Sequence, residues 1–430
     1  MTGSRLRPLA WALAVVLLAA CSRSEQARDQ RFPGRHLEVL AVWSGTEQQQ
    51  FQRVAAAFER RTGVTIGYTS AGHGLATELD SRIAENRAPD VAFLPQPGLL
   101  RRLAAEGRLV PLGGRTEEVV AGNYGAVWRS LGSAGGRLYG VWFKAANKSL
   151  IWYNVGVFER GGVVPPGTLD RLVEVARTLS ASGVPAFSVA GADGWTLTDW
   201  FENLYLATAG PRRYDLLAEH RIPWTDESVK DALRLLARLL DPSLVAGGTE
   251  GALRTPFQAS VEKTFGTPPS AAMVFEGDFV AGVVLGRTNA RLGVDADVFA
   301  FPSAGPSAAG VVGGGDAAVL LRPSDAGHAF LRYLATPEAA AIWAARGGFL
   351  SPNRNLDISV YQDEITRSVA RRLLDAGDEF RFDLSDLQPA AFGGTASQGL
   401  PRRLQEFLLS RDVDATAARL ETEARAAFGG

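Results

Sequence analysis

Strand-like and helix-like segments alternate along residues 36–95, and this alternation constrains the fold more than any other feature of the sequence. HLEVLAVW (36–43) predicts a strand, and EQQQFQRVAAAFERRTG (47–63) has the apolar spacing of a helix that ends at glycine. A second strand, VTIGYTS, a helix near 75–85 and the buried strand DVAFLP (90–95) follow. The order strand–helix–strand–helix predicts an α/β fold with a parallel sheet.

The chain is too long for a single hydrophobic core. It has 430 residues, and cores stop growing beyond about 250–300 residues, so we expect two lobes. Further amphipathic helices are predicted at 169–183, 228–241 and 325–348, and further strand-like segments at 185–191, 270–284 and 297–302. Two glycine-rich stretches, GVVGGGDAAVLL (310–321) and ARGGFLSPN (345–353), predict crossings between structured parts.

The N-terminus has the layout of a secretion signal. Two arginines, Arg5 and Arg7, precede an apolar run that is too short to span a bilayer comfortably. LAAC, which ends at Cys21, resembles the lipobox of bacterial lipoproteins, in which the cysteine is lipidated after cleavage. We therefore predict a signal peptide over 1–20, followed by a lipidated cysteine and a polar tether over 21–36. The alternative is an ordinary signal with an incidental cysteine.

Net charge and catalytic motifs argue against several functional classes. The formal net charge is −1, which gives no electrostatic attraction for nucleic acid. The four histidines are scattered without the spacing of a zinc site, and neither a nucleophile elbow nor a phosphate-binding glycine loop occurs. The single cysteine permits no disulfide within the chain. The sequence therefore predicts no catalytic residues, no metal ligands and no cofactor.

One pair of acids leaves an enzymatic alternative open. Glu276 and Asp278 lie two residues apart in FEGDF and would share one face of an extended strand. Glycosidases use two carboxylates that flank the scissile bond, so a surface-anchored glycan hydrolase is one interpretation of this pair. Hydrogen bonding to a ligand or a hinge is the second interpretation, and a solvated turn is the third.

Several polar and aromatic residues are placed where α/β folds bind ligands, at the carboxyl ends of strands. Trp43 ends the first strand, and Gln96 follows the buried strand at 90–95. Lys144 and Asn147 lie between two hydrophobic runs, in a chain that has only four lysines. Each candidate has a structural alternative. Trp43 could be a core residue, Gln96 could belong to a plain turn, and the lysines could be solvated.

Ordered segments along the chain resemble one known family. VLAVWSGTEQQQFQRVAAAFERRTGVTI, APDVAFLPQPGLLRRLAAEGRLVPL and FKAANKSLIWYNVGVFERGGVVPPGTLDRL are similar to segments of the extracellular solute-binding proteins of bacterial ABC importers. SAAMVFEGDFV, GGGDAAVLL, FLRYLATPEAAAIWAARGGFLSPN and FDLSDLQPAA continue the resemblance in the same order. The most similar branch binds carbohydrates and includes maltose- and α-glucoside-binding proteins, and the lipobox agrees with it.

This resemblance implies a two-lobed clamp of the periplasmic-binding-protein type, α/β in class, with three crossing segments and the ligand enclosed between the lobes. The crossings are expected near Phe143–Asn147, Gly313–Asp316 and Arg346–Phe349. The lobes are expected to comprise 37–144 plus 315–342 and 145–314 plus 343–430.

The implied function is that of the substrate-binding component of an ABC-type carbohydrate importer. Such a protein captures an α-glucoside-like sugar or oligosaccharide by hinge closure and delivers it to the transmembrane subunits of a permease. The resemblance further implies a monomer without catalytic activity, outside the cytoplasm and tethered to the membrane by the lipid on Cys21. The same fold with a non-sugar cargo, such as a glycerophosphodiester, is an alternative.

The resemblance also indicates which residues contact the ligand, since such proteins place aromatic faces against sugar rings and polar groups against hydroxyls. Together with the candidates above, the predicted ligand-binding residues are Trp43, Ser44, Gly45, Glu47, Gln96, Lys144, Asn147, Asp193, Trp195, Glu276, Phe279, Gly315 and Asp316. Trp195 is expected to stack on the ligand, whereas Trp200 is expected in the core and Thr196 at the cap of their shared helix. The stretch GGTASQGLPRR (393–403) lacks the aromatic pair that relatives carry, so maltose itself is not implied.

Overall fold

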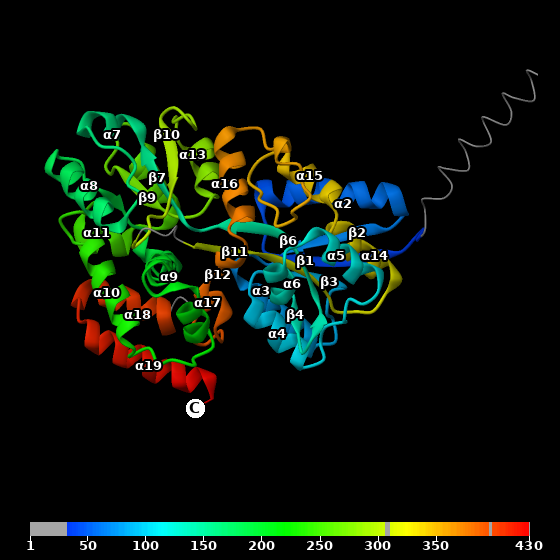
Figure 1. Ribbon diagram of the computed structural model, residues 1–430. Coiled ribbons are helices and arrows are strands. Elements are labelled where there is room, and N and C mark those ends of the chain that lie inside the picture. The colour runs from blue at the N-terminus through cyan, green and yellow to red at the C-terminus, as the bar shows by residue number, and fades with distance from the viewer. Residues whose placement is uncertain (1–31, 306–309, 395–397, 430) are drawn as a thin grey trace, which may run out of the picture.

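The computed structural model describes residues 32–305, 310–394 and 398–429, which form two bodies of helices and strands that lie side by side (Figure 1). The predicted signal peptide and Cys21 lie outside the described residues. Each body contains its own main sheet, which confirms the predicted two-lobed α/β class. We call the body around the first strand lobe 1 and the other lobe 2. Within the described residues, no helix combines the length and the apolar character needed to cross a membrane.

Lobe 1 is built on a six-stranded sheet of order β12-β11-β3-β1-β2, in which β6 also pairs with β11. Its strands are β1 (His36–Ala41), β2 (Thr65–Ser70), β3 (Val91–Leu94), β6 (Gly140–Asn147), β11 (Val311–Leu320) and β12 (Phe380–Phe382). β1 pairs in parallel with β2 and β3, as predicted, whereas β11 is antiparallel to β3 and β6. Every residue of β3 is buried, so both faces of the sheet are covered at this strand.

The helices of lobe 1 pack their apolar faces on this sheet. They are α2 (Gly45–Thr62), α3 (Leu75–Ala84), α4 (Pro97–Ala105), α5 (Arg115–Asn123), α6 (Ala126–Leu131), α14 (Asp325–Leu334), α15 (Pro337–Ala344) and α16 (Glu364–Asp375). In α2 the buried side chains include Phe51, Val54 and Phe58, at the spacing of one helix face. The helix ends at Gly63, whose φ of 76° is a left-handed conformation that glycine adopts without a Cβ clash.

Lobe 2 has a four-stranded sheet of order β10-β7-β9-β8 surrounded by helices. The strands are β7 (Leu150–Asn154), β8 (Phe187–Ser188), β9 (Met273–Phe275) and β10 (Ala296–Ala300). The helices are α7 (Val155–Gly161), α8 (Leu169–Ala181), α9 (Trp195–Ala218), α10 (Glu227–Leu239), α11 (Gly248–Arg254), α12 (Phe257–Phe265), α13 (Val280–Arg287), α17 (Leu384–Leu387), α18 (Gly399–Ser410) and α19 (Val413–Phe428). Trp200 is 1% exposed and contacts Phe187 and Phe275, which confirms its predicted place in the core.

Helix α9 differs from the helix expected in this region at both ends. It begins at Trp195 with Gly194 at its N-cap, whereas the hydroxyl of Thr196 donates to the carbonyl of Ala190 at 2.5 Å, so the predicted cap at Thr196 is wrong. The expected end at Gly210 is a kink instead, because Gly210 has φ 77° and ψ 168° and Pro211 follows. The helix then continues to Ala218.

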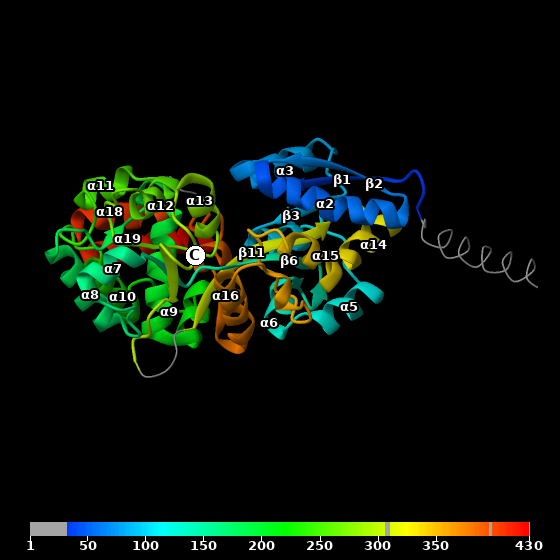
Figure 2. The ribbon, with the colours of Figure 1, turned by 90° about the horizontal axis from the view of Figure 1, so that it is seen from above.

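The chain crosses between the lobes three times, and β6 and β11 run between the two bodies (Figure 2). The first two crossings agree with the expected segments, at the end of β6 and at the start of β11. The third lies where β12 leads into α17, and the expected crossing at Arg346–Phe349 is wrong. Gly347 and Gly348 form a tight turn there with φ of 80° and 67°, and Phe349 stacks under Trp343 within the core of lobe 1.

The buried side chains favour a different boundary late in the chain. We expected residues 343–430 in lobe 2, but Trp343 packs on Trp43 of lobe 1, and β12 pairs with β11 in the lobe 1 sheet. We therefore propose that lobe 1 extends to Phe382. The remaining boundaries expected from the sequence stay predictions.

Candidate functional site

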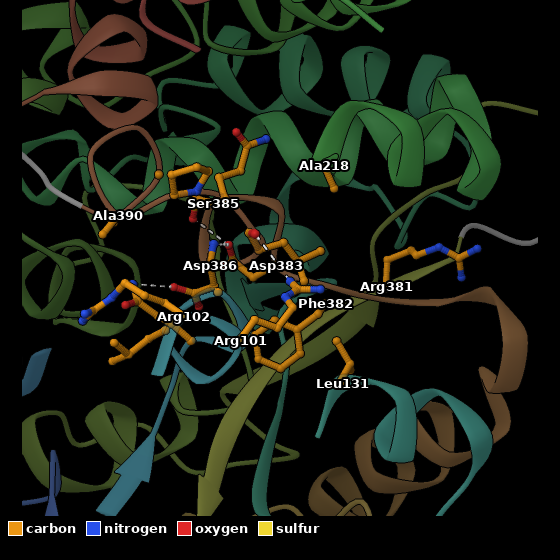
Figure 3. A pocket seen from close by; sticks show the side chains of 18 of the residues that line it. Arg101, Arg102, Leu131, Ala218, Arg381, Phe382, Asp383, Ser385, Asp386 and Ala390 are labelled. Carbon is orange, nitrogen blue, oxygen red and sulfur yellow. Dashed lines mark hydrogen bonds between the residues drawn. The ribbon is translucent and has the colours of Figure 1, made fainter. Parts of the chain in front are cut away.

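A cavity of about 1930 Å³ lies between the lobes and is lined by residues of both (Figure 3). Lobe 1 contributes side chains of α3, α4 and α6, and lobe 2 contributes both ends of α9 and the segment around α17. In Figure 3, Asp383, Ser385 and Asp386 lie on one wall, and Arg101 and Arg102 of α4 approach them from the other lobe. Cavities at such domain interfaces are common binding sites for small ligands.

An aromatic group stands at the lobe 2 side of this cavity. Trp195 is half-buried and lines the cavity, because it is the first residue of α9 and its ring projects from the helix end. Its ring centroid lies 5.6 Å from that of Phe257 and 6.0 Å from that of Phe279. The ammonium nitrogen of Lys148 is 5.6 Å from the Trp195 centroid, which is within the range of a cation–π contact. Phe257 and Phe279 thus hold an indole at the ligand side of lobe 2.

Lys148, which follows β6 at the first crossing, is paired with two buried carboxylates. Its Nζ lies 3.2 Å from Asp199 on α9 and also contacts Asp383, the N-cap of α17. Burial lowers the pKa of Lys148, but the charges of Asp199 and Asp383 outweigh this and hold it well above the usual value. Burial likewise raises the pKa of Asp383, and Lys148 outweighs it and holds that pKa below its usual value.

Further carboxyl groups surround this ion pair. Glu202 accepts the backbone N–H groups of Leu384 and Ser385 at 2.7 and 3.0 Å, so it binds the first turn of α17. Carboxylate oxygens of Asp199, Glu202 and Asp383 lie within 4.8 Å of one another. The ammonium of Lys148 supplies the positive charge at this cluster, so we assign no metal ion to it.

Glu276 is the most isolated of the acids. It is 0% exposed, and both of its carboxyl oxygens lack a hydrogen-bond donor among the described residues. Burial is the main cause that raises its pKa well above the usual value, followed by the charge of Asp199. Asp278 instead accepts the backbone N–H of Asn147 at 2.8 Å, next to the first crossing. Of the three interpretations of this pair, the structure favours hinge hydrogen bonding for Asp278.

A second polar group lies at the lobe 1 end of the crossing strands. Lys144 forms an ion pair with Glu47, and its Nζ lies 5.6 Å from the ring centroid of Trp343. Trp43 donates its indole N–H to Asp316 at 3.1 Å. Burial raises the pKa of Asp316 to about 6, although Lys144 partly opposes this.

Trp43 occupies the core rather than an exposed position. It is 1% exposed and its ring packs against Phe51, Phe93 and Trp343 at centroid distances of 5.2, 4.6 and 5.0 Å. Its two faces are therefore covered by other side chains. This packing agrees with the alternative raised from the sequence, in which Trp43 is a core residue.

A hydrogen bond between Gln96 and Asp386 is one of those that join the two lobes beside the cavity. Gln96, at the N-cap of α4, donates to Asp386 of α17 at 3.2 Å. Burial raises the pKa of Asp386 to about 7, and the charge of Asp383 adds to this shift. The backbones also approach closely here, since a Cβ added to Gly98 would lie 3.0 Å from the carbonyl oxygen of Gln388.

The predicted site residues divide into those that line the cavity and those that support it. Gln96, Asp193 and Trp195 line the cavity. The others are placed around it: Ser44 and Gly45 start α2, Glu47 pairs with Lys144, Trp43 contacts Asp316, Asn147 and Gly315 pair strands β6 and β11, Glu276 is buried, and Phe279 contacts Trp195.

Two supporting roles are clear from hydrogen bonds. Asp193 accepts the backbone N–H of Phe257 at 2.6 Å, so it fixes the start of α12 beside the cavity. Asn147 is 1% exposed, and its side-chain oxygen accepts the N–H of Ser149 at 3.0 Å. Both side chains therefore stabilise the cavity wall through contacts with the protein backbone.

The predicted set of ligand-binding residues leaves out several residues that the structure brings to the cavity, although Lys148 stands in the segment expected to line it. Lys148, Asp383 and Asp386 line it, and Phe257 contacts Trp195. The signal for the two aspartates was the spacing D-L-S-D directly after a short strand-like segment, where the first aspartate caps a helix. Phe257 had no local signal, because it reaches Trp195 only through the packing of α12 against the start of α9.

Comparisons with known proteins identify relatives over most of the chain. The sequence profile described as "Bacterial extracellular solute-binding protein" matches residues 43–341. The osmoprotective compounds-binding protein GgtB of Synechocystis sp. is 31% identical over 396 residues, covering 90% of this chain and 92% of that protein. The alpha-glucosides-binding periplasmic protein AglE of Rhizobium meliloti is 32% identical over 391 residues, covering 87% of this chain and 84% of that protein.

Solved structures share the fold at lower sequence identity. The bacterial solute receptor AcbH, described as having an exclusive preference for β-D-galactopyranose, superposes with a TM-score of 0.80 at 19% identity and covers 91% of this chain and 99% of its own. A chitin oligosaccharide binding protein superposes with a TM-score of 0.77 at 18% identity, covering 92% and 99%. At these identities the similarity establishes the two-lobed fold.

Proposed function

The chain belongs to the family of bacterial extracellular solute-binding proteins, and from this membership we propose that it is the substrate-binding component of an ABC-type carbohydrate importer. Its cargo is an α-glucoside-like sugar or oligosaccharide, which is the class named for AglE. The observation that carries this proposal is the indole of Trp195 at the wall of an interlobe cavity that also presents carboxylates. The protein has no catalytic role and passes its ligand to the transmembrane subunits of a permease.

The chemistry of the cavity suits a neutral, hydroxyl-rich ligand. The apolar C–H face of a sugar ring packs on an indole, while its hydroxyl groups donate hydrogen bonds to carboxylates. Asp383 and Asp386 line the cavity near Trp195 and supply such acceptors. Lys148 lies against the Trp195 ring and also lines the cavity, so it can donate to a sugar oxygen. We add Lys148, Asp383 and Asp386 to the residues predicted from the sequence.

Closure of the lobes is the step that encloses the ligand. The three crossings lie next to one another beside the cavity, so rotation about them changes the distance between α4 and α17 without breaking either core. The hydrolase alternative is disfavoured, because the carboxyl of Glu276 is 0% exposed and cannot reach a glycosidic oxygen.

The N-terminal predictions complete the proposal. A signal peptide over 1–20 directs export, and lipidation of Cys21 tethers the protein to the outside of the membrane. The tether over 21–36 keeps both lobes free to contact a permease, and this arrangement requires only a monomer.

Calorimetric titration with maltose, trehalose, sucrose and methyl α-glucoside tests the carbohydrate assignment. We expect one of these sugars to bind with one-to-one stoichiometry, and Trp195→Ala to weaken its binding about tenfold or more, since a stacked aromatic face is lost. Trp195→Phe, which keeps an aromatic face, is the matched variant and should lose less affinity.

Two outcomes would count against the carbohydrate assignment. The first is heat only from a non-sugar cargo such as glycerophosphocholine, while all four sugars give none. The second is a sugar affinity that Trp195→Ala leaves unchanged, because the cavity wall at Trp195 would then not be the ligand site.

A further inference from the structure

Two buried acids beneath Trp195 have carboxyl oxygens without a donor. Asp199 and Glu276 are both 0% exposed. Oδ2 of Asp199 and both oxygens of Glu276 lack a hydrogen-bond donor among the described residues, yet the two side chains are within hydrogen-bonding reach of each other. Two ionised carboxylates at that separation would repel each other strongly where no water screens them. A carboxylic acid O–H on one of the two would satisfy both groups at once.

One cation lies beside this pair, and a third acid shares it. Lys148, from the first crossing, is the ammonium that contacts the cluster, and it is shared by Asp199 and Asp383. Asp383 also accepts the hydroxyl of Ser385 at 2.6 Å and the N–H of Asp386 at 3.1 Å, so it is satisfied as an anion. Glu276 therefore faces Asp199 without a positive charge of its own.

The other titratable groups of the cluster belong to α9 and α17. On α9, Glu202 is held by two backbone N–H groups of α17 and by the hydroxyl of Tyr214 at 3.4 Å. On α17, Asp386 accepts from Gln96 across the cavity. Each of these groups has donors of its own, whereas Oδ2 of Asp199 and both oxygens of Glu276 have none among the described residues. Asp199 also lies within hydrogen-bonding reach of Asp383.

The pair lies directly behind the proposed ligand platform. Trp195 and Asp199 are four residues apart on α9, so they lie on the same face of the helix. Lys148 connects them, because its Nζ is 3.2 Å from Asp199 and 5.6 Å from the Trp195 ring centroid. A change in the charge of the pair therefore acts on the position of Lys148 and, through it, on one face of the indole.

We propose that Asp199 and Glu276 share one proton, and that this proton makes them positioning residues for Lys148 and the Trp195 platform. With the proton bound, the pair carries one negative charge, and Lys148 contacts this charge as well as that of Asp383. When the proton leaves to solvent, the pair carries two charges, Asp199 and Glu276 separate, and Lys148 is drawn away from the indole. Ligand affinity then falls. This consequence rests on the proposed function, whereas the shared proton does not.

The direction of the pKa shifts agrees with a shared proton. Burial raises the pKa of Asp199 well above its usual value; Lys148 opposes this shift, and Asp383 adds to it. Burial and then the charge of Asp199 raise the pKa of Glu276 in the same direction. Both shifts favour the neutral acid.

Carboxyl ¹³C resonances and indole N–H resonances test the pair without a ligand. In protein labelled at glutamate and aspartate carboxyl carbons, at least one of the resonances that Glu276→Gln and Asp199→Asn remove should report a protonated group at pH 7. The indole N–H of Trp195, identified with Trp195→Phe, should shift as pH rises into the alkaline range. Glu276→Gln should abolish this shift, because its amide N–H donates to Asp199 at every pH. Carboxylate resonances for both Glu276 and Asp199 at pH 7 would overturn the proposal.

Two further variants test whether the shift of Trp195 depends on this pair of acids in particular. Asp199→Asn offers an amide to Glu276 from the other side and should also abolish the alkaline shift of Trp195. Glu250→Gln removes an acid of α11 that pairs with Arg254 and should keep the wild-type profile. If the shift of Trp195 persists in both pair variants, the pair does not position the platform.

Titration with maltose, trehalose and sucrose from pH 6 to pH 10 then tests the link to ligand binding. We expect wild-type affinity to fall by up to about tenfold for each pH unit above the pKa of the pair, and the affinity of Glu276→Gln, whatever its value at pH 7, to stay constant over this range. A wild-type profile in Glu276→Gln would contradict the positioning role. If none of the three sugars binds while the NMR results hold, the carbohydrate assignment fails and the shared proton stands.

Discussion

At the scale of single residues, burial decides which polar side chains can meet a ligand. Trp43, Glu276 and Asn147 were singled out for their chemistry, yet each is at most 1% exposed. Trp195 was singled out on the same grounds and lines the cavity, because it occupies the first position of a helix. Residue type alone could not separate these cases, since a tryptophan after a strand and a tryptophan before a helix look alike in a sequence.

Asp316 gives a pH-dependent prediction for stability. Burial raises its pKa to about 6, above the value of about 4 for an unfolded aspartate. The native state therefore binds more protons than the unfolded state between these values. This contribution is complete below about pH 4 and is lost as pH rises to about 6, at a cost of at most about 3 kcal/mol.

Asp316→Asn should flatten this part of the profile, because an amide does not titrate and its oxygen still accepts from Trp43. The measurement is the free energy of unfolding in urea from pH 4 to pH 7, compared with wild type. An unchanged slope would show that Asp316 titrates as it does in the unfolded chain.

At the scale of elements, glycines set where helices bend and end. Apolar periodicity predicted α2 between 47 and 63, and the structure has it at Gly45–Thr62, capped by Gly63 as expected. The same kind of reasoning placed the end of α9 at Gly210, but the chain turns there and resumes its helix. A glycine followed by proline permits both outcomes, and the packing of Tyr214 and Leu217 into the lobe 2 core selects the second.

Gly210→Ala should destabilise the protein by about 1–3 kcal/mol, because φ 77° with ψ 168° is a conformation that essentially only glycine adopts. Space does not explain the effect, since a Cβ there would meet nothing within 4 Å. Gly122→Ala, in α5, is the matched control: a Cβ also finds open space, the conformation is helical, and stability should rise by about 0.4–1 kcal/mol. Thermal and urea unfolding of both variants checks the contrast. Equal effects of the two substitutions would refute it.

At the scale of the whole molecule, the lobes meet where α4 faces α17. Gln96 donates to Asp386 there, and the guanidinium of Arg101 donates to the carbonyl of Leu387 at 3.5 Å. Gly98 lies between these contacts, and a Cβ on it would lie 3.0 and 3.3 Å from two carbonyl oxygens of lobe 2. The approach of the lobes at this edge therefore depends on the missing side chain of one glycine.

Gly98→Val should hold this edge open and weaken sugar binding about tenfold. The apparent affinity falls because a smaller fraction of the protein reaches the closed form. Small-angle scattering with saturating sugar should show a larger radius of gyration than for wild type. Gly113→Val is the control, since a Cβ at Gly113 meets nothing within 4 Å. If Gly98→Val binds and closes like wild type, contact between α4 and α17 does not limit closure.

Much of the fold was predictable because its signals are local. The strands and helices of residues 36–95, the two-lobed class and the first two crossings follow from periodicity, chain length and glycine content. The third crossing was not predictable in the same way. ARGGFLSPN has the composition of a linker, but its glycines make a turn whose Phe349 packs on Trp343 and Phe143. Composition does not distinguish a turn inside a core from a link between two cores.

The sequence by itself determined the local elements, the family resemblance and the residue types available for a neutral, hydroxyl-rich ligand. It did so because the periodicity of apolar residues and the order of motifs can be read directly along the chain. Only the tertiary structure decided that Lys148 meets Asp199 and Asp383, that Glu276 is buried against Asp199, and that Gly98 faces a carbonyl of the other lobe. These contacts join residues 51 to 290 positions apart, and desolvation, which sets their energies, exists only once both lobes have packed.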